Sequence, residues 1–297
     1  MKLLVLGVDR GENPQDQTDC YAFVAAALMR EFKRILPGDV RLVNVDLASD
    51  LSAIQGPADF VLFVGYRNIW RRFSLPDIRQ RTGCRKIASL SDYSFSLDWV
   101  EANSKPDWSF CFADHGGLNS TVIHAPCVKS YYVNEPKEKI ILMDHGWPGQ
   151  ANTELEWTFR ISTWLTPLSV RYKILRIARY HDYEKPSWKA HEVALPMVPF
   201  SEWLRLTNHV ESFVVTHIET YGFQIMDMVA RGIRVISPVG LLPKGHVERF
   251  QIPLFKNGEE MRKILMSPVE PRWNEMVNLC SDYSEVAETI VSKLKSL

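Results

Sequence analysis

Residues 213–238, FVVTHIETYGFQIMDMVARGIRVISP, constrain the fold of this chain more than any other stretch. The apolar run at residues 213–215 has the β-branched and aromatic character of a short buried strand. Apolar residues at helical spacing begin at Phe223, and Gly232 stands where a helix is often followed by a glycine. A second buried strand begins at residues 235–236. This order predicts two parallel strands joined by a right-handed crossover through one helix.

Two acidic residues lie within this stretch, one in the loop and one in the helix. Glu219 follows the first strand, at the sheet edge where open α/β proteins bind ligands, and Asp227 lies further along in the helix. Backbone N–H groups at the helix start, between the two acids, can bind a phosphate. The candidate residues there are Thr220, Tyr221, Gly222, Phe223 and Gln224. The alternative is that Thr220 only caps the helix and that both acids are solvated.

The segment from Glu219 to Val235, ETYGFQIMDMVARGIRV, resembles the E-x7-E segment of retaining glycosyltransferases with the GT-B fold. In that family a strand precedes E-[ST]-[FY]-G, an apolar helix carries the second acid, and G-x-x-V begins the next strand. The resemblance implies that Glu219 lies beside the donor sugar and that Asp227 holds the ribose hydroxyls. Asp227 stands where the family mostly has Glu, so its side chain reaches one methylene less far. The family also reads the nucleotide base largely with backbone that corresponds to residues 197–200.

The resemblance implies an α/β fold with two Rossmann-like domains that face each other across a cleft, with a last helix that often crosses back. The remaining sequence alternates strands and helices, which predicts parallel, doubly wound sheets. A polar break at residues 130–139 is the predicted linker. We therefore expect an acceptor-side domain at residues 1–133 and a nucleotide-sugar-binding domain with a terminal helix at residues 134–297. Strands are predicted at residues 2–7, 41–47, 60–64, 86–90, 110–111, 121–124, 140–143 and 173–177, and helices at 21–32, 153–165, 203–208 and 271–297.

Three loops of the first domain carry candidate site residues. Gly7 and Gly11 fit the glycine loop that closes over donor and acceptor in the family, although an ordinary turn explains them equally. Asp92 follows the fourth strand and could orient an acceptor hydroxyl. His115 precedes a glycine pair and could contact acceptor or phosphate, the alternative being a solvated turn.

The cations that grip the diphosphate in the family, a Gly-Arg pair and a later Lys, have no counterparts at the matching positions. His145, Arg176 and Arg179 are the candidate replacements. The eight histidines show no spacing typical of a zinc site. The family generally needs no bound metal, so the expected ligand is a nucleoside-diphosphate sugar as donor substrate, without a permanent cofactor.

The amino-acid composition limits which binding partners and which cellular compartment are expected. Lys plus Arg and Asp plus Glu each number 35, so no overall field attracts nucleic acid. Five scattered cysteines without C-x-x-C pairs predict reduced thiols in a cytoplasmic protein. No apolar run approaches the ~20 residues of a membrane span, and the first residues read as a strand rather than a signal peptide. The basic aromatic segment Tyr66–Phe73 could contact a membrane surface or a charged acceptor, or form a solvated helix face.

These observations predict a retaining glycosyltransferase of polysaccharide or glycan biosynthesis, with Glu219 and Asp92 as catalytic residues. The acceptor would be a hydroxyl of a glycan or of a lipid-linked sugar. Two alternatives stay open. The missing cations favour a non-catalytic binding or scaffolding protein on the same fold, and a sugar-nucleotide epimerase is the third possibility.

Overall fold

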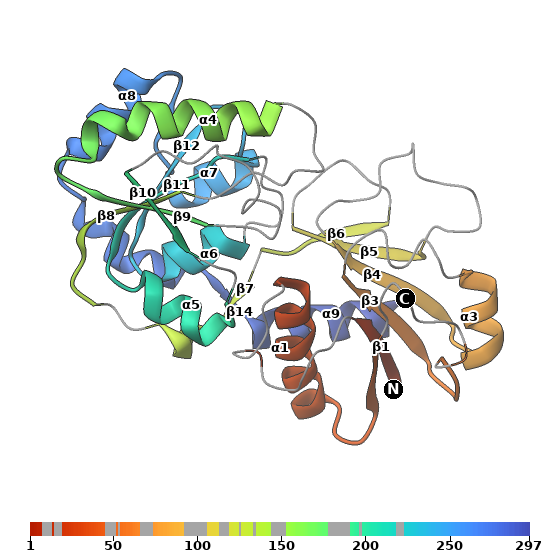
Figure 1. Ribbon diagram of the computed structural model, residues 1–297. Coiled ribbons are helices and arrows are strands. Elements are labelled where there is room, and N and C mark those ends of the chain that lie inside the picture. The colour runs from red at the N-terminus through yellow and green to blue at the C-terminus, as the bar shows by residue number, and fades with distance from the viewer. Residues whose placement is uncertain are drawn as a thin grey trace. The chain divides into compact units, whose positions relative to one another are not determined.

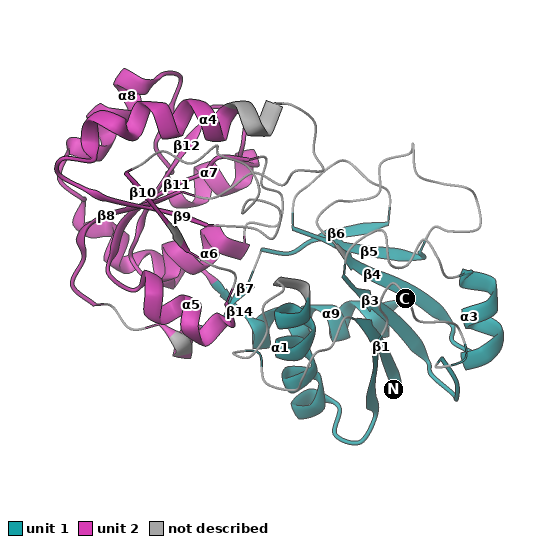
Figure 2. Ribbon diagram, viewed as in Figure 1, with its two compact units in different colours: residues 1–128, 281–297 teal, residues 129–280 magenta. Residues whose placement is uncertain are grey.

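The chain forms two compact units in the computed structural model, residues Met1–Val128 with Ser281–Leu297 and residues Lys129–Cys280 (Figures 1 and 2). Each unit is organised around a six-stranded parallel sheet, so the predicted α/β class with two parallel-sheet domains is confirmed. The structure describes residues 1–7, 14, 20–44, 52, 54–65, 74–91, 106–112, 119–124, 126–132, 135–143, 153–177, 191–195, 198–217 and 223–297.

Unit 1 is built on a sheet with the strand order β2-β1-β3-β4-β5-β6. Every residue of β1 and of β3 is buried, as expected for central strands of a parallel sheet covered on both faces. Chain order reverses between β1 and β3, which makes the carboxyl ends of these two strands the switch point of this sheet. The strands are β1 (Leu3–Gly7), β2 (Val40–Asn44), β3 (Phe60–Val64), β4 (Lys86–Ser91), β5 (Trp108–Cys111) and β6 (Ser120–Val122).

Helices cover the two faces of this sheet. On one face α1 (Cys20–Ile35) packs against the first three strands and against α9 (Tyr283–Ser296). The rings of Phe23 and Tyr283 meet edge to face with centroids 6.0 Å apart. The other face has a separate core cluster with α3 (Leu75–Thr82), whose first turn is capped by Ser74.

The terminal helix α9 belongs to unit 1, as the resemblance to GT-B proteins implied. The second unit therefore ends at Cys280 rather than at residue 297, the predicted end of the second domain. The physical reason is the apolar stripe of α9, which is buried within unit 1. The chain passes between the units twice. The first connection runs through β7 (Pro126–Cys127) into η4 (Lys129–Tyr131), and the second runs into β14 (Ser281–Asp282). The strands β7 and β14 pair as a small parallel sheet.

Unit 2 has a sheet with the strand order β10-β9-β8-β11-β12-β13. In chain order this is 3-2-1-4-5-6, the doubly wound order of dinucleotide-binding proteins, and its switch point lies between β8 and β11. The predicted parallel pairing within residues 213–238 is confirmed by β11 and β12. The strands are β8 (Glu138–Met143), β9 (Lys173–Ile177), β10 (Glu192–Leu195), β11 (Val210–Val214), β12 (Arg234–Pro238) and β13 (Leu254–Phe255).

Figure 1 shows helices on both faces of this sheet. The helices α4 (Thr153–Leu165) and α8 (Gly258–Met266) enclose an apolar cluster against one face. The helices α5 (Phe200–Thr207) and α6 (Phe223–Ala230) lie on the other. Unit 2 also contains η5 (Thr166–Leu168), α7 (Lys244–Phe250) and the 3-10 helix η7 (Pro271–Leu279).

Several predicted bounds differ from the structure by a few residues, and two segments differ more clearly. β8 begins at Glu138, inside the predicted linker, because Glu138 N–H already bonds to His209 O at 2.8 Å. The tail from residue 271 is not one helix. A capping box formed by Asp282 and Glu285 begins α9 at Tyr283, and η7 precedes it as a separate element.

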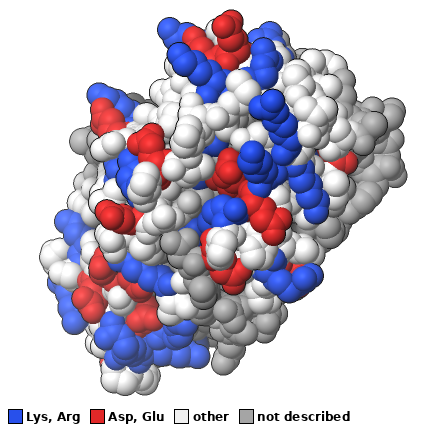
Figure 3. Space-filling model, turned by 90° about the vertical axis from the view of Figure 1, so that its left-hand side faces the viewer, with Lys and Arg blue, Asp and Glu red and all other residues white. Residues whose placement is uncertain are grey.

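The surface carries charges of both signs. Figure 3 shows Lys and Arg interspersed with Asp and Glu over one face of the molecule, as the equal numbers of acidic and basic residues lead one to expect. Among the helices that the structure describes, none is long and apolar enough to cross a membrane.

Candidate functional site

The carboxyl edge of the unit 2 sheet brings the ends of β8 and β11 together at the switch point. Met143 and Val214, the last residues of these strands, are register partners. Beyond β11, Val215 N–H bonds to Ile236 O at 3.0 Å and Thr216 is buried, so the chain follows the sheet before it leaves toward α6. A ligand at this edge would meet the loop between β11 and α6, which contains Glu219 in the sequence.

The starts of α5 and α6 contact each other. The rings of Phe200 and Phe223 pack with centroids 5.7 Å apart. This contact places Phe200, the last residue of the segment predicted to read the base, next to the helix start predicted to bind phosphate. Gln224 adds a polar group there, since its Oε1 is buried and has no hydrogen-bond partner among the residues described.

Asp227 occupies the second turn of α6 and only 1% of it is exposed. Its Oδ2 accepts hydrogen bonds from Trp203 Nε1 at 2.7 Å and from Arg231 Nη2 at 2.5 Å. The Tyr132 hydroxyl also favours the charged form of the carboxylate and lowers its pKa. Asp227 Oδ1 accepts no hydrogen bond from any described residue. Burial raises the pKa of Asp227, and the positive charge of Arg231 opposes this rise.

The ion pair of Asp227 and Arg231 is part of a closed ring of hydrogen bonds between α5 and the end of α6. Arg231 Nη1 donates to Thr207 Oγ1 at 2.7 Å, and Thr207 Oγ1 donates to Trp203 O at 2.7 Å. The ring closes through the bond from Trp203 Nε1 to the Asp227 carboxylate. Buried polar networks of this kind are stable only when their members are paired, and this one joins two helices.

Lys137 lies beside this ring, in the segment that leads into unit 2. Its Nζ donates to Asn208 O at 2.9 Å. Burial lowers the pKa of Lys137 to about 8; repulsion from Arg231 adds to the shift, and Glu135 and Asp227 oppose it. In the same segment, Pro136 O forms a hydrogen bond with His209 Nδ1 at 3.1 Å.

Arg176, a predicted phosphate-binding cation, is buried under α4. Its Nη1 forms an ion pair with Glu192 Oε2 at 3.2 Å, and neither side chain is exposed by more than 2%. Ser162 donates to the other oxygen of Glu192. The guanidinium therefore joins β9 to β10 in this structure, and phosphate binding by Arg176 stays a prediction.

Gly7 ends β1 at the switch point of unit 1, opposite Val64 of β3. A Cβ at Gly7 would lie 3.2 Å from Val64 O and 3.2 Å from Ala25 Cβ, so the close packing of α1 favours glycine here. The packing of α1 thus explains why residue 7 is a glycine. The role of Gly7 in a loop that closes over the ligand stays a prediction.

The other predicted site residues lie outside the described part of the chain, and their roles stay predictions. They are Gly11, Asp92, His115, His145, Arg179, Glu219, Thr220, Tyr221 and Gly222, together with the segment Tyr66–Phe73. Among the residues described, no group of three His, Cys, Asp or Glu side chains could hold a metal ion.

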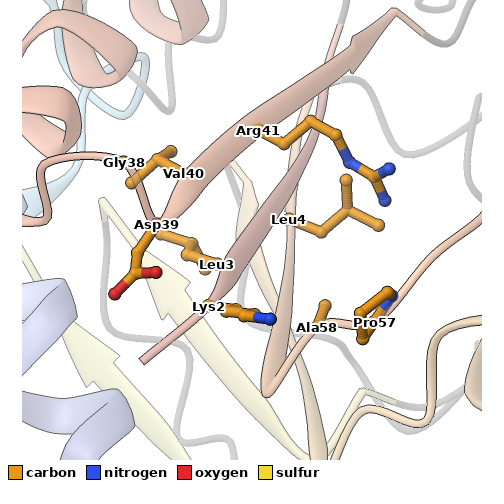
Figure 4. Close-up of a pocket in the computed structure, with 9 residues that line it drawn as sticks. All are labelled: Lys2, Leu3, Leu4, Gly38, Asp39, Val40, Arg41, Pro57 and Ala58. Atoms are coloured by element: carbon orange, nitrogen blue, oxygen red, sulfur yellow. The ribbon is translucent and has the colours of Figure 1, made fainter.

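A separate pocket of about 180 Å³ lies at the amino edge of the unit 1 sheet (Figure 4). Asp39 and Arg41 point to different sides of it, and Arg41 Nη2 donates to Gln55 O. Ligands of doubly wound sheets bind at the opposite edge, so this pocket is not the candidate site. Its lining residues are Lys2, Leu3, Leu4, Gly38, Asp39, Val40, Arg41, Pro57 and Ala58.

Sequence reasoning missed Trp203, Arg231 and Lys137 as neighbours of Asp227. One signal was available, because Asp227 and Arg231 are spaced i,i+4 and form an ion pair. The contacts with α5 and with the segment before β8 are tertiary, and the spacing of residues does not reveal them.

No family model matches the sequence, and a comparison with curated proteins found no significant match. Solved structures resemble it over its full length. Anabaena Alr3699/HepE in complex with UDP and glucose is 13% identical, with a TM-score of 0.67 and 100% of both chains covered. Sucrose-phosphate synthase from Thermosynechococcus elongatus is 10% identical, with a TM-score of 0.66 over 100% of this chain and 99% of that one.

A third structure is the UDP-GlcNAc 2-epimerase from Neisseria meningitidis bound to UDP-GlcNAc, 9% identical, with a TM-score of 0.59 and 100% of both chains covered. At these identities the likeness shows the fold alone. The fold is the GT-B fold of two parallel-sheet α/β domains.

Proposed function

We propose that this protein is a glycosyltransferase that moves a sugar, with retention, from a nucleoside-diphosphate donor to a hydroxyl of a glycan or lipid-linked acceptor. The observation that carries the proposal is the order of elements in unit 2. The loop containing Glu219 leaves β11 at the switch point between β8 and β11, and α6 follows it directly. The UDP and UDP-sugar ligands in structures of the same fold support a UDP-linked donor.

In this proposal the diphosphate rests on the N–H groups at the start of α6, and the base lies near residues 197–200. Cleavage of the bond between the sugar and the diphosphate leaves negative charge on the departing UDP. Fixed N–H donors stabilise such charge without reorganisation. Glu219 lies beside the sugar, Asp92 orients the acceptor hydroxyl, and His145 or Arg179 supplies positive charge for the phosphates.

Donor binding is tested by thermal unfolding with UDP, GDP, ADP and CMP sugars. A ligand at a hundredfold excess over its Kd adds about 2.7 kcal/mol of stability, which gives a clear rise in Tm. A rise with UDP sugars and none with the others supports the assigned donor. No rise with any nucleotide contradicts the proposal.

Glu219→Ala tests the catalytic assignment. We expect transfer, or hydrolysis of the donor, to fall at least ~100-fold, equivalent to roughly 2.7 kcal/mol of transition-state stabilisation. Glu248→Ala, an acid exposed on α7, is the matched control and should retain activity. NMR of the glycoside product tells retention from inversion. Wild-type turnover in the Glu219 variant would remove this residue from the mechanism.

Epimerisation is the second candidate, because UDP-GlcNAc 2-epimerases share the fold. The two activities differ in product. UDP-GlcNAc incubated without acceptor would yield a second sugar nucleotide under an epimerase, whereas a transferase would leave the sugar configuration unchanged and release UDP slowly. Tight nucleotide binding with neither product would identify a non-catalytic binding protein.

A further inference from the structure

The two connections between the units both reach α6. Tyr132, four residues after the end of the first stretch of unit 1, acts on the Asp227 carboxyl and lowers its pKa. In the same incoming segment, Lys137 Nζ donates to Asn208 O, at the end of α5, at 2.9 Å. At the other connection, η7 packs against the end of α6. A Cβ at Gly232, which has φ +70°, would lie 3.0 Å from Asn274 Oδ1 and 3.4 Å from Trp273 O. Helix α6 therefore contacts both the segment by which the chain enters unit 2 and the segment shortly before the chain leaves unit 2.

The Asp227 carboxylate is the group through which α6 makes the first of these contacts. Its Oδ2 already accepts bonds from Trp203 and Arg231, and 1% of the residue is exposed. A ribose hydroxyl could be accepted only by Oδ1. Removal of the carboxylate charge would disturb α5 and the incoming segment together, whether or not a ligand is present.

We propose that Asp227 is a positioning residue, which fastens α6 to α5 and to the incoming segment and so fixes the helix start at Phe223 and Gln224. The inference rests on the proposed function for its effect on nucleotide binding. It assigns Asp227 an indirect role in place of the ribose contact implied by the family resemblance. The ring contacts at α5 and the Tyr132 contact then act on the ligand through the position of α6.

Ligand analogues separate the two roles. UDP, 2′-deoxy-UDP and 3′-deoxy-UDP are titrated by calorimetry into wild type, Asp227→Asn, Trp203→Phe and Tyr132→Phe. We expect each variant to weaken UDP binding about tenfold and to weaken both deoxy analogues by the same factor. Trp157→Phe, a change of the same kind on α4, is the control and should bind like wild type.

A ribose contact gives a different pattern. The deoxy analogue that lacks the contacted hydroxyl would then bind wild type and Asp227→Asn equally, while Trp203→Phe and Tyr132→Phe would leave UDP affinity unchanged. That result would overturn the positioning role and would leave the proposed function intact.

A measurement without nucleotide keeps the inference testable if the protein binds none. In protein labelled with ¹⁵N-tryptophan, the Trp203 indole N–H resonance is identified by its loss in Trp203→Phe. We expect Asp227→Asn to shift this resonance. We expect both Asp227→Asn and Trp203→Phe to lower the hydrogen-exchange protection of residues 129–138. When the two substitutions are combined, the loss of stability should be smaller than the sum of the two separate losses. An unshifted resonance, additive losses and unchanged protection would overturn the proposal.

Discussion

At the scale of single residues, buried arginines in unit 2 donate to several backbone and side-chain oxygens at once. Arg234 donates from Nη1 to Ile264 O at 2.9 Å and to Ser267 O at 2.8 Å. Its Nη2 donates to Leu265 O at 2.9 Å, so one guanidinium satisfies the last carbonyls of α8. Burial lowers the pKa of Arg234, and the nearby Glu211 opposes the shift.

Arg234→Met should lower the free energy of unfolding of unit 2 by about 3–5 kcal/mol, because three carbonyls lose a charged donor and the partly buried Glu211 loses its ion-pair partner. Urea unfolding followed by circular dichroism measures the loss. Arg205→Met is the matched control: Arg205 pairs with Glu202 on the exposed face of α5, and its removal should change stability little. Equal losses in the two variants would contradict the capping role of Arg234.

Lys137 predicts a dependence of stability on pH. Its pKa is about 8 in the folded protein and 10.5 is the ordinary value, so between these values the unfolded chain binds more protons. This group therefore lowers stability below pH 8, and its contribution makes stability rise as the pH increases from 8 to 10.5.

Lys137→Met should remove this rise, and below pH 8 it should relieve a penalty on the order of 1 kcal/mol, reduced because the amine is only half-buried. Lys137→Arg keeps its charge throughout the range and should also lack the rise. Unfolding midpoints of the three proteins between pH 7 and 10.5 give the comparison. Parallel pH profiles would mean that Lys137 does not titrate in this window.

At the scale of elements, the tight contact between α4 and α8 depends on one glycine. Asn257 caps α8 by accepting from Glu259 N and Glu260 N, both at 3.0 Å. The next residue, Gly258, lies against the ring of Trp164, and a Cβ there would come within 2.5 Å of Trp164 Cγ. Trp164 also packs edge to face on Phe255, so the indole has little room to move.

Gly258→Ala should therefore destabilise unit 2 by about 1–3 kcal/mol, the usual cost of an overpacked core. Gly245 in α7 is the control, because a Cβ there meets nothing within 4 Å. Gly245→Ala should be neutral or stabilising by about 0.5 kcal/mol, since alanine favours helix. Thermal unfolding of both variants decides whether the clash or the helix propensity dominates at each glycine.

How far the sequence predicts these elements depends on how local their signals are. The bounds of β3, β9 and α4 were predicted as observed, because each is a single apolar or amphipathic run. The two-residue strands β7, β13 and β14 are too short to leave a pattern. The order of elements around Glu219 was readable from the sequence. The burial of Asp227 depends on tertiary packing with α5, whose Trp203 donates to the carboxylate, and no local pattern reveals such a contact.

At the scale of the whole molecule, unit 1 is discontinuous in the sequence and is completed by α9. Ile290 lies at the centre of the buried stripe of α9 and is fully buried. Arg34 of α1 and Glu288 of α9 add an ion pair at 3.2 Å on the rim of this contact. Lys293 lies 3.9 Å from the centroid of the Trp108 ring in β5.

Ile290→Ala should destabilise unit 1 by about 2–4 kcal/mol and leave unit 2 unchanged, because the cavity forms within one unit only. Hydrogen exchange read by mass spectrometry separates the two units in one experiment. Ser292→Ala, on the exposed side of the same helix, should change neither. Equal loss of protection in residues 129–280 would show that the two units unfold as one.

The pairing of β7 with β14 has a consequence for synthesis. Residues 129–280 leave the ribosome before residues 281–297, so unit 2 has all of its sequence while unit 1 still lacks β14 and α9. Until α9 has been synthesised, the apolar side of α1 that packs against α9 stays uncovered by that helix. A nascent chain with such an apolar surface is a target for chaperones. Unit 2 can therefore finish folding first, and α1 reaches its final packing later although it is translated earlier than unit 2.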